Sequence, residues 1–345
     1  MLIHRARLSQ SVVQMKHTVK NWAHAPGVHC GSTALSNLMS FHGRPLSEAM
    51  CFGLGAGLGV YYLKTDIFSP SRTIATRSAG LESEFFNSIG VNFSWEMDPD
   101  NASAWRKVKN FIDRDLPVVL QTDIFYLDYY NSKTHFNGHV VLAWGYDEEA
   151  GKAFLSDTGW QGLNEVPLAS LEKARISPAP PFPLENNFFA LEKLPASFNI
   201  ESAVRQSLKK QAEEMLREEG AFGFSGVGAM KSISADLASW KDAHDWKWCA
   251  RFSYQVIEKR GTGGGAFRLL YSRFLSEAEK LLPELKGKKL PERMKEIAGK
   301  WTELGGLLKE ISDSDHPVGF AEAGDLAGDI AEMEEAYYKD VLKLV

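Results

Sequence analysis

Apolar residues recur every three or four positions in several segments of the first part of the chain, which predicts amphipathic helices. Ser47 has the side chain of a helix N-cap and Glu48 suits a first helical turn, so a helix is expected to begin after Pro45. Gly43 is a natural helix stop. The helices predicted here cover residues 32–41, a segment from residue 47 into a glycine-rich run, 81–89 and 102–114.

The pattern then changes to runs of β-branched and aromatic residues, which are typical of strands. The segments 138–146 and 152–156 flank the turn sequence DEEAG, so we expect them to form a hairpin. Two further strands are predicted at 117–124 and 188–194, and the proline-rich stretch 178–183 is expected to be a stiff connector. Helices followed by antiparallel strands predict an α+β fold for this part.

After Pro195 the strand signals stop and helical periodicity continues to the end of the chain. Six helices are predicted at 200–219, 229–240, 246–259, 266–282, 292–311 and 321–341. Ten of the 14 prolines precede this change, which supports a boundary there. The sequence therefore predicts two domains, an α+β domain over residues 1–194 and a helical bundle over 195–345.

Composition places the protein among ordinary globular chains, with 44% hydrophobic and 24% charged residues over 345 positions. The formal net charge of −5 provides no basic field for nucleic acid or an anionic membrane surface. The first 20 residues have no apolar core of signal-peptide length, and no apolar run is long enough to cross a membrane. Three cysteines suit a reducing compartment, so we expect a cytoplasmic protein.

Cys30 is the first residue with candidate chemistry, because it begins the first strong helix in the sequence HCGSTALSNL. Unpaired backbone N–H groups and the positive end of the helix dipole lower the pKa of a thiol in that position and favour the thiolate. Gly31 would let a substrate approach the backbone closely. Cys51 and Cys249 lie in apolar surroundings and are interpreted as small hydrophobic residues.

His139 and Asp157 complete a candidate triad. His139 begins the strand GHVVLAWGYD, and Asp157 follows the neighbouring strand of the predicted hairpin. A cysteine on a helix, a histidine on a strand and a carboxylate on the next strand follow the order of papain-like enzymes. Each residue alone has a structural interpretation, whereas the three in this order favour catalysis.

Two other regions suggest ligand contacts. Asp123 ends a strand and precedes an aromatic loop that includes Tyr126; the alternative is an aromatic satellite of the core. The GTGGG turn before residue 266 has backbone N–H groups that suit an anion, so Gly264 and Arg268 are assigned to a phosphate-bearing donor. The alternative for this turn is a hinge or tight turn. The run Gly53–Gly59 is interpreted as close packing of a helix.

The sequence resembles the butirosin biosynthesis protein H family. HCGSTALSNL, SEAMCFGLGAGLG and GHVVLAWGYDEE resemble its N-terminal domain, and RGTGGGAFRLLYSRFLSEA resembles the helical domain that commonly follows. The resemblance implies a papain-like cysteine acyltransferase, and the namesake transfers an acyl group from an acyl carrier protein thioester to an amine of an aminoglycoside. Cys30 would then be the nucleophile, His139 the base and Asp157 the orienting acid.

Papain-like proteases place a glutamine shortly before the cysteine as an oxyanion donor, but WAHAPGVHC contains none. His24, His29 or backbone groups are the candidates that remain. We also assign substrate contact to His29, Gly31 and Glu48, and expect no cofactor and no metal site.

Three functions remain open. The first is acyl transfer from an acyl carrier protein or coenzyme A thioester to a small-molecule amine or hydroxyl in specialised metabolism. A local basic patch for the acidic carrier would involve Arg260, Arg268 and Arg273. The second is hydrolysis by the same triad, as a peptidase, amidase or thioesterase, and the third is a non-catalytic binding module. The oligomeric state is open, a homodimer included.

Overall fold

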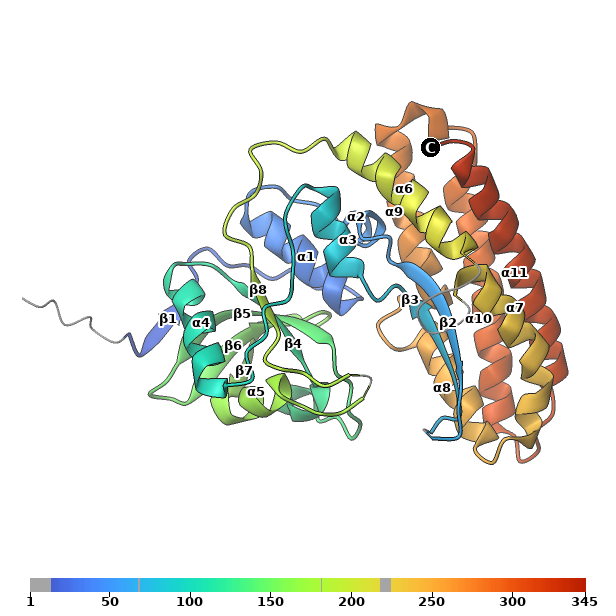
Figure 1. The fold of residues 1–345 in the computed structure, drawn as a ribbon, viewed down its shortest axis with the longest axis horizontal. Helices are drawn as coiled ribbons and strands as arrows, with labels where there is room; N and C mark the ends of the chain where they lie inside the picture. Colours follow the sequence, from blue (N-terminus) through green and yellow to red (C-terminus); the bar gives the residue numbers. More distant parts are fainter. Residues whose placement is uncertain (1–13, 68, 181, 218–224) are drawn as a thin grey trace, which may run out of the picture. The chain divides into compact units, whose positions relative to one another are not determined.

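The computed structural model describes residues 14–67, 69–180, 182–217 and 225–345. Within it the chain forms two compact units. The sheet unit combines residues up to His24 with Trp95–Glu192, and the helical unit combines Ala25–Ser94 with Lys193–Val345 (Figure 1). The domain boundary predicted at residue 195 lies close to the point where the chain leaves the sheet unit for the last time, after Glu192. Residues 25–94, which the prediction assigned to the first domain, belong to the same compact unit as the C-terminal helices. Residues 1–13, Pro181 in the predicted connector and the end of the helix predicted at 200–219 lie outside the described residues.

The sheet unit contains a six-stranded antiparallel sheet in the order β7-β6-β5-β4-β8, with β1 beside the far end of β5. Its strands are β1 (Lys16–Thr18), β4 (Val118–Thr122), β5 (His139–Asp147), β6 (Lys152–Ser156), β7 (Asn164–Pro167) and β8 (Phe188–Ala190). The predicted hairpin is confirmed as β5–β6, with Asp147 paired to Lys152. The predicted last strand is only three residues long in the structure, because β8 is an edge strand that pairs with β4 alone.

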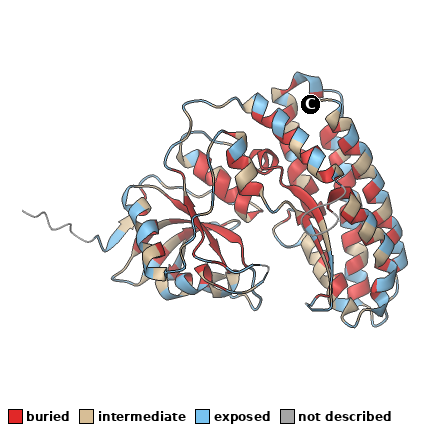
Figure 2. Cartoon of the chain, in the orientation of Figure 1, coloured by how far each residue is buried: buried red, intermediate tan, exposed pale blue. Residues whose placement is uncertain are grey.

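Two helices accompany this sheet, α4 (Asn101–Asp113) and α5 (Leu168–Arg175), and two short 3-10 turns follow β4, η1 (Ile124–Tyr126) and η2 (Asp128–Tyr130). Asp100 caps α4 by accepting from the Ser103 N–H. Strands β4 and β5 are almost entirely buried (Figure 2). The short elements β1, β7 and α5 were not predicted, because their few apolar positions give no clear period.

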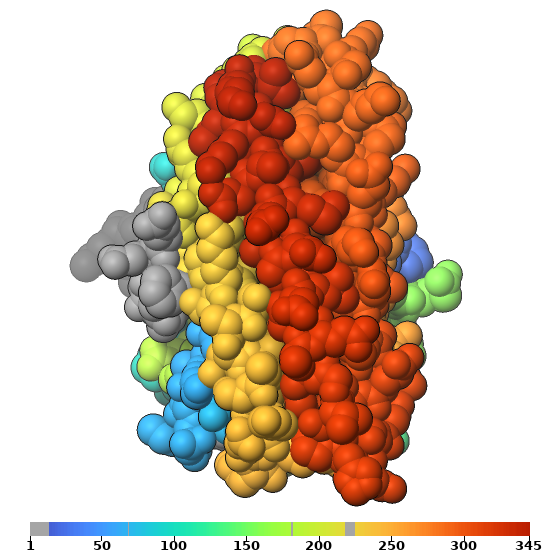
Figure 3. All heavy atoms as spheres, turned by 90° about the vertical axis from the view of Figure 1, so that its right-hand side faces the viewer, coloured from blue at the N-terminus to red at the C-terminus, as the bar shows by residue number. Residues whose placement is uncertain are grey.

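The helical unit confirms all six predicted C-terminal helices and three of the earlier ones. Its helices are α1 (Cys30–Phe41), α2 (Glu48–Leu54), α3 (Leu81–Ser88), α6 (Ile200–Leu216), α7 (Gly226–Leu237), α8 (Trp246–Glu258), α9 (Arg268–Leu281), α10 (Leu290–Asp313) and α11 (Phe320–Leu342), with short 3-10 turns η3 (Ala238–Asp242), η4 (Gly265–Phe267) and η5 (Pro283–Leu285). Helix α11 runs along one face of the bundle, flanked by α7 and α10 (Figure 3). Together the two units confirm an α+β fold.

The glycine-rich run closes α2 tightly against its neighbours. Ser47 caps α2 as expected, by accepting a hydrogen bond from the Met50 N–H. A Cβ atom on Gly53 would lie 2.1 Å from the ring of Phe274 in α9, so only glycine fits there. The predicted close packing of a helix is thus confirmed at Gly53, but α2 ends at Leu54 and Gly59 already lies in β2 (Leu58–Lys64), so the prediction is wrong for the rest of the run. Cys51 in the same helix is fully buried, and burial raises the pKa of its thiol.

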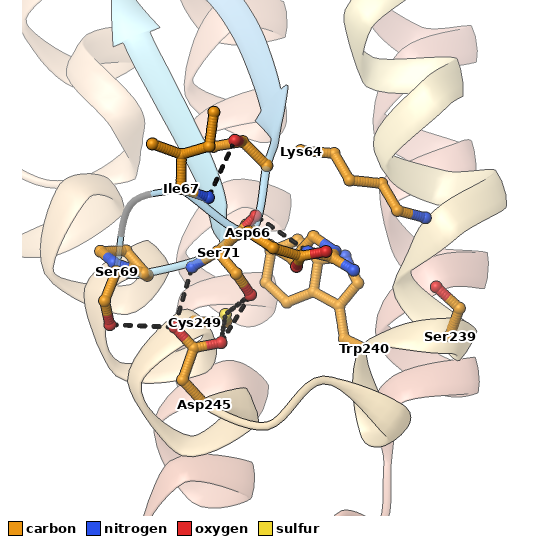
Figure 4. Close-up of polar contacts among 12 residues, drawn as sticks. Lys64, Asp66, Ile67, Ser69, Ser71, Ser239, Trp240, Asp245 and Cys249 are labelled. Carbon is orange, nitrogen blue, oxygen red and sulfur yellow. Dashed lines mark hydrogen bonds and ion pairs between the residues drawn. The ribbon is translucent and has the colours of Figure 1, made fainter.

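A second antiparallel hairpin, β2 (Leu58–Lys64) and β3 (Arg72–Arg77), was not predicted, because the glycines around its first strand obscured the pattern. It is fixed to the C-terminal helices through Asp245, as Figure 4 shows. The Asp245 carboxylate accepts from the hydroxyls of Ser69 and Ser71, from the Ser71 N–H at 2.9 Å and from the Cys249 thiol at 3.2 Å. Burial opposes ionisation of Asp245, but these hydrogen bonds outweigh it and lower its pKa to about 2.

Asp236 provides the second anchor of this hairpin. Its carboxylate accepts from the Lys64 ammonium at 2.6 Å and from the Tyr62 hydroxyl, which in turn accepts from the Trp240 indole N–H at 3.0 Å. Residues 58–77 are therefore held to α7, η3 and α8 by polar contacts as well as by packing. In the described ranges, no helix has the length and apolar character needed to cross a membrane.

Candidate active site

Cys30 is the first residue of α1, at the helix start that the sequence predicts. His29 caps the helix, because its Nδ1 accepts from the Ser32 N–H at 3.2 Å. Cys30 is half-buried, whereas Cys51 and Cys249 are fully buried. Of the three thiols, Cys30 therefore combines partial exposure with a helix N-terminus, where a thiolate is stabilised.

Glu48 fixes the segment that leads into Cys30. Its carboxylate accepts from the backbone N–H groups of Val28 (3.0 Å) and His29 (2.8 Å) and from the hydroxyl of Thr33 (3.0 Å). Donors on both sides of the cysteine thus converge on one carboxylate. Four oxygen lone pairs allow such multiple acceptance, and the result is a rigid approach to the helix. The geometry gives Glu48 a positioning role.

The GTGGGAF turn of the C-terminal part packs against this segment. A Cβ atom on Gly261 would lie 3.2 Å from the carbonyl oxygen of Val28, and both residues belong to the helical unit. Phe267 packs edge-to-face on the ring of His29, with centroids 5.4 Å apart, and stacks on Phe52 at 5.5 Å. A turn more than 230 residues later in the sequence therefore supports the residue before Cys30.

The same turn uses its N–H groups internally. Gly264 has a φ of +90° and donates to the Thr262 hydroxyl, while the Gly265 N–H donates to the Glu258 carboxylate at 3.0 Å. A carboxylate of the chain itself thus occupies the place that was assigned to a phosphate. This favours the tight-turn interpretation, and contact of Gly264 with a substrate stays a prediction that the geometry does not support.

Arg268 lies in the core of the helical unit. Its guanidinium is fully buried and forms a two-point ion pair with Glu334, at 2.8 Å and 3.0 Å, above the ring of Trp301. A buried pair of this kind needs every partner it has. Because Arg268 has no exposed surface, the structure does not support its predicted contact with a ligand. For the same reason Arg268 does not contribute to a surface basic patch.

His139 and Asp157 meet as predicted, at the ends of β5 and β6 in the sheet unit. Nε2 of His139 lies 2.9 Å and 3.0 Å from the two carboxylate oxygens of Asp157. The His139 side chain is 7% exposed and that of Asp157 is fully buried. An Nε2–H that donates to Asp157 leaves proton exchange with a thiol to Nδ1.

Two further hydroxyl groups bind the Asp157 carboxylate, one of them from the aromatic turns after β4. The Tyr129 hydroxyl donates to Asp157 at 2.7 Å, and the Thr158 hydroxyl donates at 2.8 Å. Burial raises the pKa of Asp157, but the charge of His139 and these hydrogen bonds outweigh it, so the pKa lies below its ordinary value. Asp157 is thus held as a carboxylate, which fixes the orientation of the His139 ring.

Asp123 follows β4 directly, at the end of a strand as predicted. Its buried carboxylate accepts from His135 Nδ1 at 2.6 Å, from the Ser177 hydroxyl at 2.7 Å and from the backbone N–H groups of Phe125 and Phe136. These contacts tie the loop after β4 together. Tyr126 lies in that loop, half-buried, with its ring 5.7 Å from that of His135. Substrate contact by Asp123 and Tyr126 stays a prediction.

Gly31 shows a contact that sequence reasoning missed. A Cβ atom on Gly31 would lie 2.4 Å from Oε1 of Glu82 and 3.0 Å from a methyl of Leu81. The missing side chain therefore makes room for a buried carboxyl of α3. No pattern in the sequence marks Glu82, because its position in an ordinary amphipathic helix gives no signal. Among the described residues, no group of three His, Cys, Asp or Glu side chains has the arrangement of a metal site.

Two family descriptions match the chain. The description "Butirosin biosynthesis protein H, N-terminal" matches residues 29–158, and a domain of unknown function (DUF4872) matches residues 169–341, half of the chain. The chain belongs to the butirosin biosynthesis protein H-like family. A comparison with curated protein sequences finds no match.

The match to the butirosin biosynthesis protein H N-terminal region runs from His29 to Thr158 and contains Cys30, His139 and Asp157. The DUF4872 match contains the GTGGGAF turn and Arg268. The triad predicted from the sequence draws Cys30 from the helical unit and His139 with Asp157 from the sheet unit. Of the seven predicted substrate-contact residues, five belong to the helical unit, and Asp123 and Tyr126 belong to the sheet unit.

Proposed function

We propose that this member of the butirosin biosynthesis protein H-like family is a cysteine acyltransferase of specialised metabolism. The observation that carries the proposal is the buried His139–Asp157 pair, whose hydrogen-bond distances suit a base and its orienting carboxylate. Cys30, half-buried at the start of α1, is the nucleophile that such a pair would activate. The match to a family named for a protein of butirosin biosynthesis supports a role in specialised metabolism.

In the first half-reaction His139 takes the proton of the Cys30 thiol. The thiolate sulfur forms a bond to the carbonyl carbon of a thioester, and the π electron pair moves to the oxygen. When this pair returns, the bond to the leaving sulfur breaks and the protonated His139 gives its proton to the departing thiol. The products are an acyl-Cys30 thioester and a thiol.

In the second half-reaction an amine attacks the acyl-Cys30 carbonyl. His139 accepts a proton from the attacking nitrogen, an amide bond forms and the Cys30 sulfur leaves. Protonation of the sulfur by His139 restores the resting enzyme, so a thioester and an amine become an amide and a thiol. A hydroxyl acceptor gives an ester by the same steps, and water gives hydrolysis.

The proposed donor is an acyl thioester on a carrier protein or coenzyme A, and the acceptor is a small-molecule amine or hydroxyl. Arg260 and Arg273 are exposed in the helical unit and remain candidates for contact with an acidic carrier. Transfer requires that an acceptor compete with water for the acyl group, which a shielded site favours.

The test is covalent labelling of Cys30. The wild-type protein is incubated with a panel of acyl-carrier-protein and acyl-N-acetylcysteamine thioesters, and intact mass and peptide mapping follow the adduct. We expect an acyl mass on Cys30 that is absent from Cys30→Ala, and that disappears when an amine acceptor is added, with formation of the amide. Loss of the acyl group to water at the same rate with and without amines identifies a hydrolase. A protein that gains no acyl mass from any donor, with an ordinary thiol reactivity, is a binding module and the proposal fails.

A further inference from the structure

Glu82 is a buried acid beside the start of α1 that the steps above do not use. It is the second residue of α3, which packs on α1, and only 7% of the residue is exposed. Its Oε1 lies against Cα of Gly31, so close that any side chain at Gly31 would meet it. Gly31 follows Cys30 directly, and all three residues belong to the helical unit.

The carboxyl group of Glu82 accepts a hydrogen bond from its own backbone N–H. The charge of Arg77 on β3 favours the carboxylate, and His29 acts in the same direction, whereas the Cys30 thiolate opposes it. Burial is the largest effect, and it raises the pKa of Glu82. A neutral acid carries an O–H that needs an acceptor, and a buried donor without one is unfavourable.

A second donor lies next to this carboxyl group. The backbone N–H of Gly31 is in the first turn of α1, where helices provide no internal acceptor, and no acceptor for it is found in the parts of the chain that the structure describes. Of the two histidines that the sequence suggested as oxyanion donors, one has partners on both nitrogens and the other is enclosed by aromatic rings. Both nitrogens of His24 have partners, at 2.6 Å and 3.0 Å, and the ring of His29 is enclosed by Phe52 and Phe267.

We propose that Glu82, as a neutral carboxylic acid, donates a hydrogen bond to the acyl carbonyl oxygen while that oxygen carries negative charge, together with the backbone N–H of Gly31. The inference rests on the proposed function, in that it takes Cys30 as the nucleophile. As the Cys30 sulfur bonds to the carbonyl carbon, the π pair moves to the oxygen and the Glu82 O–H stabilises it. Glu82 keeps its proton throughout, because the pair returns to the carbonyl as the leaving group departs. Acids held neutral in apolar sites stabilise oxyanions in this way.

The experiment compares two reactions of Cys30. Acylation by 4-nitrophenyl acetate passes through an oxyanion, whereas alkylation by iodoacetamide does not. We expect Glu82→Leu to slow acylation about 100-fold, as the loss of one oxyanion donor does, and to leave alkylation within about threefold. Glu82→Gln keeps an N–H donor and should acylate within about tenfold of the wild type. Glu84→Gln, on the same helix, half-buried and paired with Lys210, is the matched control and should change neither rate.

The ratio of acylation to alkylation also depends on pH in a defined way. The ratio cancels the fraction of thiolate, so in the wild type it should fall as pH rises through the pKa of Glu82, and in Glu82→Gln it should stay flat. Equal acylation in Glu82→Leu and wild type overturns the inference, and so does an equal loss of both reactions, which marks a merely structural residue. If the wild type gains no acetyl group on Cys30 while Cys30 still alkylates, the proposed function fails and this inference falls with it.

Discussion

Nε2 of His139 lies 2.9 Å from Oδ1 of Asp157, and neither side chain is more than 7% exposed. A histidine held in this way has one orientation, and in the proposed reaction this would decide which ring nitrogen exchanges protons before a substrate binds. The pair lies within a single unit and belongs to adjacent strands of one hairpin. Its geometry therefore depends on the register of β5 and β6.

If the proposed function holds, replacement of Asp157 by asparagine should prevent His139 from activating Cys30. The amide can hold the ring in the wrong tautomer, and we expect acylation of Cys30 to slow by about 10³–10⁴-fold, as in other triads that lose this carboxylate. Single-turnover acylation, followed by mass spectrometry, measures the effect. Tyr129→Phe removes one hydrogen bond from the same carboxylate and should slow the reaction less than tenfold. A variant Asp157→Asn with wild-type rates would exclude Asp157 from catalysis.

Gly31→Ala should disturb the Glu82 carboxyl more than the fold. The added methyl lies 2.4 Å from Oε1 of Glu82 and 3.0 Å from Leu81, so the carboxyl has to move. We expect a loss of about 1–3 kcal/mol in the free energy of unfolding, the usual range for overpacking. The double variant Gly31→Ala with Glu82→Ala should recover much of it, and urea titrations of the four proteins give the coupling energy. Strictly additive losses would show that the two residues do not meet.

Phe267→Leu should change the reactivity of Cys30, although the two residues are far apart in the sequence. The substitution shortens the side chain that packs on His29 and Phe52. We expect unfolding to become easier by about 1–2 kcal/mol, and the rate of Cys30 alkylation to change while that of the fully buried Cys249 does not. Tyr254→Phe, a conservative change elsewhere in the helical unit, is a suitable control. Unchanged Cys30 alkylation in Phe267→Leu would argue against support of α1 by this turn.

The Asp245 anchor predicts an acid-dependent part of the stability. Its pKa is lowered from 3.8 to about 2 in the folded protein, so the stabilisation is complete above about pH 4 and is lost as pH falls towards 2. Asp245→Asn should therefore be less stable than the wild type by about 1–3 kcal/mol at pH 7, and the two should converge near pH 2. Urea unfolding at both pH values measures the difference. A gap that persists at pH 2 would mean that ionisation of Asp245 is not its source.

Long periodic segments were predictable from the sequence, and short ones were not. The six C-terminal helices and the β5–β6 hairpin each have several apolar positions that agree on one period. The β2–β3 hairpin was missed, because the glycines at 57 and 59 were assigned to the close packing of a helix, whereas they allow close approach of Phe52 and of the backbone at Arg77. His139 and Asp157 were predictable as a pair, since a hairpin brings its strand ends together. Glu82 was not, because its contact with Gly31 depends on how α3 packs.

Arg268 and Gly264 illustrate a different limit. A basic residue after a glycine turn suggests an anion site, but the sequence does not reveal that Glu334 and Glu258 supply the anions. Only long-range packing decides whether such groups face a ligand or another part of the chain.

The chain passes between its two units three times, after residues 24, 94 and 192. This limits where such proteins can be divided or recombined. Residues 25–94, which include Cys30, and residues 193–345 form one compact unit, in which α2 packs on Phe274 and His29 packs on Phe267. Cutting the chain after Glu192 would separate Cys30 from the residues that pack against its helix, although the sequence pattern changes there. A chimera between family members should therefore exchange residues 25–94 and 193–345 together, and the sheet with His139 and Asp157 as the other piece.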